Sequence, residues 1–176
     1  PRWILRRYNL FDRTITLPNG TTIRYDRYVV PCCATCNTAM GQQIEEPISQ
    51  IIEGGHKAVM AYLKSRGSQG ILHFYVWMAL IFLKTHLKDA QLRAHRDQRK
   101  GTETISEDLQ YDWAGLHYLH TLLRCFTTNA GIHPSALGSF VAIGVRPNPS
   151  DSPFDYGDIY QSQTMMLRLG DCAFLA

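Results

Sequence analysis

The sequence lacks the marks of several protein classes. It has no low-complexity tract and no internal repeat, which excludes solenoid and fibrous architectures. Its five cysteines are few and unevenly spaced, unlike those of a disulfide-rich secreted domain. No charged start is followed by an apolar signal core. We therefore expect a protein of the reducing cytoplasm.

Long apolar runs are also lacking. The longest, ILHFYVWMALIFL at residues 71–83, is too short to span a bilayer and contains His73. It predicts a buried helix, and we expect no membrane partner. With 45% hydrophobic and 19% charged residues, the 176-residue chain has the composition of a globular protein that can bury a core.

A strong net charge is absent too, since the total is only +3, but the charges are unevenly distributed. Residues 1–31 contain six arginines against two aspartates. The basic end of the chain is therefore also the end that carries three of its cysteines.

Local patterns predict a β-hairpin and a helix in the N-terminal part. Residues 18–20 (Pro-Asn-Gly) are typical of a turn between two β-prone runs, 14–17 and 21–30. The second strand is expected to run directly into the cysteines. Residues 38–52 have helical character, and the glycine pair at 54–55 is typical of a helix end.

The middle of the chain is predicted to be helical. A short helix at 56–64 is followed by a linker, SRGSQG at 65–70, and by the buried helix at 71–88. A second amphipathic helix is expected to begin at Ser106 as its N-cap. Its apolar stripe is predicted to contain Leu109, Trp113, Leu116, His120 and Leu123.

The C-terminal part is predicted to be β-rich. Residues 137–145 and 164–176 have the composition of strands, on either side of a loop at 146–158 that is rich in Pro, Asp and Ser. His117 and His120 form an H-x-x-H pair on the preceding helix, but no HExxH pattern surrounds them. A core histidine is the better interpretation of His120.

Cys33 and Cys36 form a C-x-x-C pair, the spacing that lets two thiolates reach one tetrahedral zinc ion. A structural zinc site needs four ligands, and the sequence has no second C-x-x-C or C-x-x-H pair. The alternative is a pair of buried or redox-active thiols, although a thioredoxin-like site would need a βαβ context. The neighbouring Cys32 is expected in the core.

Asn37 follows the second cysteine at the start of the predicted helix. Its amide oxygen would suit Mg²⁺ or Mn²⁺, or it could cap the helix. Helical spacing places Glu45 on the same face, so Glu45 could orient a ligand of the same ion or form an ordinary salt bridge.

The stretch VVPCCATCNTAMGQQIEEPI (29–48) resembles the second half of an HNH endonuclease finger, also called a ββα-metal finger. In that family a strand enters a C-x-x-C-[HN] knuckle, and the next helix presents the last metal-binding His or Asn. PRWILRRYNL (1–10) is similar to the segment that follows a Glu-His pair in a group of bacterial HNH proteins. The resemblance implies that the general-base histidine lies a few residues before Pro1.

The resemblance also implies the roles of individual residues. Cys33 and Cys36 would bind a structural Zn²⁺, and Asn37 a catalytic Mg²⁺ or Mn²⁺. The protein would hydrolyse phosphodiester bonds of nucleic acid, with DNA favoured, and residues 1–176 alone would be inactive. Five arginines become candidate phosphate contacts rather than solvated surface: Arg2, Arg6, Arg7, Arg24 and Arg27.

The sequence therefore predicts an α+β fold with two parts. Residues 1–55 would form an incomplete ββα-metal finger of hairpin, zinc knuckle and helix, and residues 56–176 a helical segment followed by a small antiparallel sheet. The alternative function is a non-catalytic zinc knuckle that binds DNA or a protein. A thiol–disulfide enzyme, with a reactive Cys33 and no metal, is a third interpretation.

Overall fold

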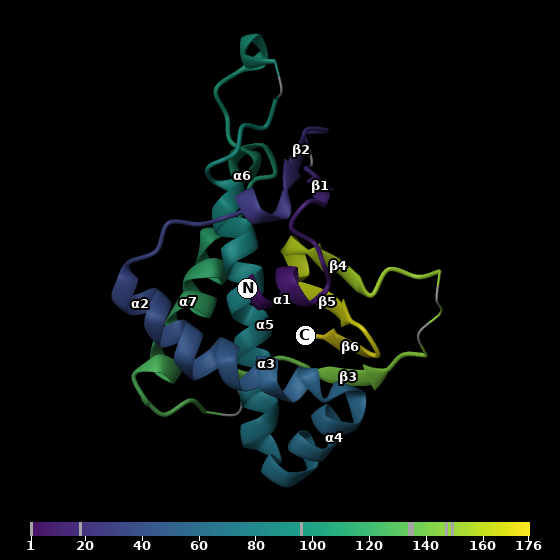
Figure 1. Ribbon diagram of the computed structural model, residues 1–176. Coiled ribbons are helices and arrows are strands. Elements are labelled where there is room, and N and C mark those ends of the chain that lie inside the picture. Colours follow the sequence, from purple (N-terminus) through teal and green to yellow (C-terminus); the bar gives the residue numbers. More distant parts are fainter. Residues whose placement is uncertain (1, 18, 96, 134–135, 147, 149) are drawn as a thin grey trace.

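The computed structural model describes residues 2–17, 19–95, 97–133, 136–146, 148 and 150–176 of the protein (Figure 1). Its elements make a mixed α+β fold, as predicted. The helices are α1 (Arg2–Arg7), α2 (Ala34–Met40), α3 (Glu46–Glu53), α4 (Gly55–Arg66), α5 (Ser68–Asp89), α6 (Ile105–Asp108) and α7 (Trp113–Thr127). The strands are β1 (Thr14–Thr16), β2 (Thr22–Arg24), β3 (Val141–Gly144), β4 (Phe154–Ile159), β5 (Thr164–Leu169) and β6 (Cys172–Leu175). Shorter turns are the 3₁₀ turns η1 (Tyr25–Arg27), η3 (Gln98–Lys100) and η5 (Tyr160–Ser162), and the π-helical turn η2 (Gly41–Glu45).

A four-stranded antiparallel sheet, in the order β3-β6-β5-β4, forms the C-terminal half. Alternate side chains point to opposite faces of a strand, and the burial follows that period. Leu167 and its partner Phe174 are each 1% exposed, whereas Met166 and its partner Leu175 are 47% and 44% exposed. One face of the sheet is therefore part of the core, and the other is open.

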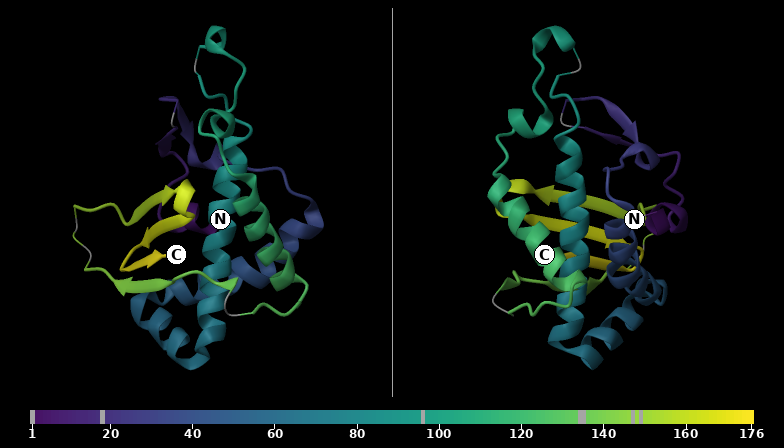
Figure 2. Two further views of the ribbon diagram at one scale, coloured as in Figure 1. Left: turned by 180° about the vertical axis from the view of Figure 1, so that it is seen from behind. Right: turned by 90° about the vertical axis from the view of Figure 1, so that its left-hand side faces the viewer.

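Helix α5 covers the buried face of this sheet. The ring of Phe74 stacks on Phe174 with centroids 5.4 Å apart, and Trp77 meets the same ring edge-on at 5.9 Å. Figure 2 (right) shows α5 crossing the strands, with α7 beside it. These large rings exclude water over a wide area, so this contact supplies much of the hydrophobic stabilisation.

The N-terminal segment packs on the same core. Trp3 of α1 stacks on Trp77 at 6.3 Å, and Ile44, Ile48 and Ile52 are buried in the cluster that contains α5 and the sheet. Residues on both sides of position 55, the predicted domain boundary, thus share one hydrophobic core. The functional division at that boundary remains a prediction.

Among the described residues, α5 is the one helix that is long and apolar enough to cross a membrane by length and composition. However, 56% of its most apolar stretch is buried inside the fold. That burial is the pattern of a core helix, as the sequence predicts for residues 71–88.

The predicted hairpin is confirmed, with Ile15 opposite Ile23 in an antiparallel pair. Its second strand is shorter than expected, because β2 ends at Arg24 and the backbone turns into η1. The strand therefore does not run directly into the cysteines. Pro18, in the predicted turn, lies outside the described residues.

The predicted linker at 65–70 is wrong. Helices α4 and α5 are separated only by Gly67, whose φ of +54° lies in a region that favours glycine. Strand β4 is a second difference, since all of it except Ile159 falls in the expected loop at 146–158. Its sequence, FDYGDI, contains two aspartates and a glycine, which are rare in strands.

The helix predicted from Ser106 is divided in two. Thr104, not Ser106, caps α6 through a capping box with Glu107, and Asp112 caps α7. Between them Gln110 has a φ of +51°, which ends helical geometry. The buried face of α7 consists of Leu116, Leu119, Leu122 and Leu123.

The stripe predicted for this segment is wrong at three positions. Leu109 and Trp113 are 42% and 46% exposed, and His120 is exposed rather than a core histidine. Because two separate caps fix two separate helices, one continuous 3.6-residue period across 106–126 does not describe the packing.

We predict that Phe174→Ala lowers the free energy of unfolding by about 3–5 kcal/mol, since it removes a ring packed between Phe74 and Trp77. Urea denaturation measures the change. The matched control is Leu175→Ala, the next residue on β6, whose side chain is 44% exposed and should cost less than about 1 kcal/mol. Equal losses would contradict the assignment of the two faces.

Candidate functional site

Two of the predicted site residues, Cys33 and Cys36, lie side by side at the start of α2. Cys33 is the N-cap of the helix, with extended backbone angles, and the Cys36 backbone N–H donates to its Sγ at 3.1 Å. Both thiols are free and exposed. The structure therefore presents an accessible dithiol turn. Cys32 is exposed as well, so its expected place in the core is wrong.

The two thiols differ in acidity. Hydrogen bonds from the Cys36 side chain and backbone lower the pKa of Cys33, because they stabilise its thiolate. The same side-chain hydrogen bond, and the nearby negative charge, raise the pKa of Cys36. Cys33 is therefore the thiol that loses its proton first, and the thiolate is the form that binds metals and attacks electrophiles.

Asn37 and Glu45 have different environments. Asn37 is exposed in the first turn of α2, next to Cys36. Glu45 instead pairs with Lys84 of α5 at 2.7 Å. The π-helical turn η2, which ends at Glu45, changes the helical period after Asn37, so the spacing of an ordinary helix does not apply here.

The five predicted arginines have different environments. Arg24 donates to both carboxylate oxygens of Asp26, at 3.0 and 2.9 Å, so its charge is balanced locally. Arg7 donates to the backbone oxygen of Glu53 at 3.2 Å. The other three are exposed, and no ion pair within the described residues involves them: Arg2, Arg6 and Arg27.

A cavity of about 320 Å³ lies at the C-terminal end of α5, a region that the sequence did not suggest. β1, the segment after η1, the Leu109–Tyr111 segment, β4 and η5 complete its walls. Its polar lining consists mainly of one histidine, two aspartates and four tyrosines: His86, Asp89, Asp158, Tyr28, Tyr111, Tyr156 and Tyr160.

His86 lies between the two carboxylates of this cavity. Its Nδ1 is 3.5 Å from Asp89 Oδ2, and its Nε2 is 3.7 Å from Asp158 Oδ2. The residue is only 2% exposed, and Nε2 has no hydrogen-bond partner among the described residues. An unsatisfied buried donor or acceptor costs about 1–3 kcal/mol, so this arrangement lowers the stability of the fold.

Phenol groups hold the carboxylates in place. Asp89 accepts hydrogen bonds from Tyr28 at 3.1 Å and from Tyr111 at 2.6 Å, and Asp158 accepts one from Tyr156. Burial, together with the negative carboxylates, raises the pKa of all three tyrosines. The three phenols therefore remain protonated at neutral pH and act as hydrogen-bond donors to the carboxyl groups.

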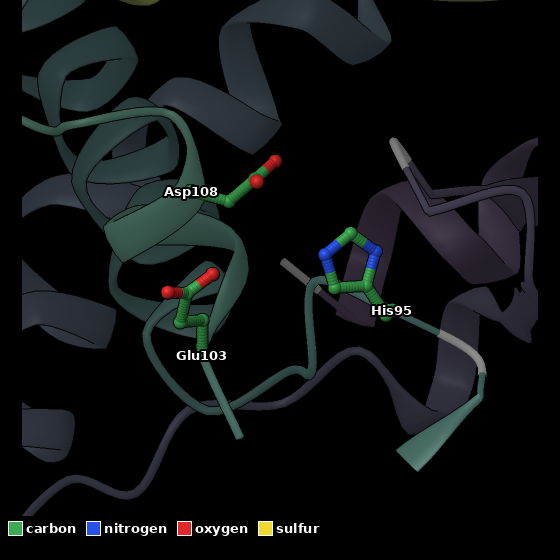
Figure 3. A group of neighbouring side chains, drawn as sticks. All are labelled: His95, Glu103 and Asp108. Atoms are coloured by element: carbon green, nitrogen blue, oxygen red, sulfur yellow. The ribbon is translucent and has the colours of Figure 1, made fainter. Parts of the chain in front are cut away.

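A second group of candidate metal ligands lies on the surface between α5 and α6. His95, Glu103 and Asp108 each offer a ligand atom, and these atoms lie within 4.8 Å of one another (Figure 3). Glu103 and Asp108 are exposed. Imidazole and carboxylate groups suit a divalent transition metal, but solvated groups of this kind are common, and no further feature of the described residues marks a site here.

No protein-family model matches the chain, and no curated protein or solved structure is significantly similar to it.

The sequence did not predict the residues of the cavity, because they come from segments far apart in the chain. One local signal was available: His86 and Asp89, at spacing i, i+3, continue the buried face of α5, whose other buried residues are apolar or glycine.

We predict that Cys33 is alkylated faster than Cys36 by iodoacetamide at neutral pH in protein freed of metal, since its thiolate is stabilised. Fragment mass spectrometry of a Cys32→Ser background measures both sites. The rate at Cys33 should reach half its maximum at a lower pH than the rate at Cys36. In Cys36→Ala this pH should rise toward the ordinary thiol value, and an unchanged profile would contradict the role of the hydrogen bond.

Proposed function

We propose that Cys33 and Cys36 bind a structural zinc ion and that the protein is a metal-dependent endonuclease of the HNH type. The observation that carries the proposal is the exposed dithiol turn at the start of α2, in which the Cys36 N–H donates to Cys33 Sγ at 3.1 Å. Such a hydrogen bond stabilises a thiolate while leaving the exposed side of both sulfurs open to an ion.

The order of the elements on either side of the cysteines supports the same proposal. The β1–β2 hairpin precedes the dithiol turn, and a helix follows it, which is the chain order of a ββα-metal finger. The exposed Arg2 and Arg6 of α1 lie on an element that contacts η1, which carries Arg27. Arginines without an acidic partner are suited to contact phosphates.

The proposed zinc site needs ligands besides these two sulfurs. Within the described residues, no histidine, cysteine or carboxylate joins Cys33 and Cys36 in a group of three. The proposal therefore requires two further zinc ligands and a general-base histidine in addition to the residues of the dithiol turn.

Residues of this chain would then have separate parts in the reaction. The exposed amide oxygen of Asn37 would bind Mg²⁺ or Mn²⁺, which stabilises the charge of the scissile phosphate. The zinc ion would fix the turn that positions Asn37, and the arginines would hold the nucleic-acid backbone.

One observation favours the second candidate, a non-catalytic zinc knuckle that binds nucleic acid. Figure 1 shows the β1–β2 hairpin and α2 well apart, joined by residues 28–33, which have no regular secondary structure. In a catalytic finger the hairpin and the helix enclose the metal, whereas a knuckle needs only the turn. This candidate predicts salt-sensitive DNA binding without cleavage.

We expect the full-length natural protein to nick supercoiled plasmid in the presence of Mg²⁺ or Mn²⁺ and not in EDTA. Asn37→Ala should reduce the rate by at least about tenfold, because it removes an ion ligand. The matched control is Thr38→Ala, the next exposed residue of α2, which should retain activity. Agarose gels measure the conversion to nicked and linear forms.

One result would decide against the endonuclease, and another against the role of Asn37. Absence of cleavage by the full-length protein, combined with DNA binding that weakens with salt, would leave the zinc knuckle as the function. Equal cleavage by the wild type and Asn37→Ala would remove Asn37 from the catalytic site.

A further inference from the structure

The cavity at the C-terminal end of α5 holds more negative charge than positive charge. Asp89 and Asp158 both line it, and the described residues supply no lysine or arginine partner to either one. Among the described residues, the ion-pair contacts of both aspartates are with His86. By formal charge, two aspartates against one histidine leave at least one negative charge without a positive partner.

The end of α5 adds to this negative potential. Thr85, His86 and Asp89 belong to the last turns of a 22-residue helix, where the unpaired carbonyl groups carry partial negative charge. A positively charged group in the cavity is therefore favoured by the side chains and by the backbone.

The hydrogen bonds within the cavity leave one carboxylate oxygen available to a ligand. Asp89 is already occupied by the phenols of Tyr28 and Tyr111. Asp158 receives only the Tyr156 hydroxyl, on Oδ2, and its Oδ1 has no hydrogen-bond partner among the described residues. The buried Nε2 of His86, also without a partner, points toward the same aspartate at 3.7 Å. Asp158 is thus the group that a cation would contact.

The geometry argues against a metal ion as the occupant. The two nitrogens of an imidazole ring diverge, and in His86 each one faces a different aspartate. His86 therefore cannot join both carboxylates around one ion. Consistent with this, the ligand atoms of His86, Asp89 and Asp158 are not among the described groups of three that lie close enough together to hold a metal ion.

The walls suit an organic cation instead. The rings of Tyr111 and Tyr160 both line the cavity and stack on each other with centroids 3.8 Å apart, which leaves only the outer face of each ring for a ligand. Aromatic faces attract ammonium and guanidinium groups, and apolar lining from Ile15, Leu17 and Leu109 can contact a short alkyl chain. A volume of about 320 Å³ lies at the small end of the range for ligand pockets, roughly 300–1,000 Å³.

We propose that this cavity binds a small organic cation, an alkylammonium or alkylguanidinium compound, whose charged group lies against Asp158 and whose alkyl chain lies along the tyrosine pair. This site is independent of the zinc site, because it shares no residue with the dithiol turn.

The test is a titration of the wild-type protein with n-butylammonium and with methylguanidinium, using n-butanol as the uncharged probe. In protein labelled with ¹⁵N-histidine, the ring signals of His86 should shift in a saturable way with at least one cation and not with n-butanol. The same cation should raise Tm. No saturable shift with either cation, or an equal response to n-butanol, would overturn the proposal.

Asp158→Asn gives the specific test, because it keeps the shape and a carbonyl acceptor for Tyr156 but removes the charge. We expect affinity for the cation to fall by at least about tenfold. The matched control is Asp155→Asn on the same strand, whose carboxylate is 49% exposed and lies near Arg168, and it should bind as the wild type does. Equal weakening by both variants, or by neither, would overturn the proposal.

The Tm of Asp158→Asn without ligand gives a second, independent measurement. If the charge of Asp158 is uncompensated, its removal should leave Tm unchanged or raise it, as is common for residues kept for binding. A marked fall in Tm would show that Asp158 is a structural partner and would contradict the proposal. Failure of this variant to fold would contradict the proposal in the same way.

Discussion

The packing of α5 against the four-stranded sheet is the contact on which the rest of the structure depends. Phe74 and Trp77 on α5 and Phe174 on β6 join their rings at the centre of the core. The same helix anchors the N-terminal segment through Trp77 and through the ion pair of Lys84 with Glu45. Its last turns carry His86 and Asp89 into the cavity. The cavity is therefore positioned by α5 itself, whereas the dithiol turn precedes η2, the segment that Lys84 of α5 holds through Glu45.

The two sites make opposite demands on stability. Cys33 and Cys36 are exposed, so their thiols cost the fold little whether or not an ion is bound. The cavity places a histidine and two carboxylates largely out of water, where charge is expensive unless it is compensated. Three phenol donors reduce that cost without cancelling the charge. Sites of this kind, costly to the free protein, are typical of places where a ligand completes the electrostatics.

Local signals predicted much of the fold. The turn residues before Thr21 predicted the hairpin, and the apolar run at 71–83 predicted α5, because neither depends on distant contacts. The break at Gln110 was missed, since the caps of α6 and α7 outweigh a continuous apolar period. Strand β4 was missed because its pairing with β5 outweighs the weak strand propensity of its own residues.

The two candidate sites also differ in how far the sequence could predict them. The dithiol turn was predicted from a spacing of three residues, which fixes the geometry locally. The cavity joins Tyr28, His86 and Asp158, and only the tertiary fold brings these positions together. A site shared by Asn37 and Glu45 stays a prediction, but its helical spacing was assigned without the π-helical turn η2, which includes Glu45 and for which the sequence carries no clear signal.

The most direct test of the account is the zinc content and sulfur coordination of the full-length protein, purified without added metal. Elemental mass spectrometry should find about one zinc ion per chain, and X-ray absorption should find Zn–S distances of about 2.3 Å that include the Cys33 and Cys36 sulfurs. Double substitution to serine should abolish this zinc binding. Absence of zinc from the wild type, or zinc retained by the double variant, would contradict the dithiol turn as a metal site and the endonuclease proposal with it.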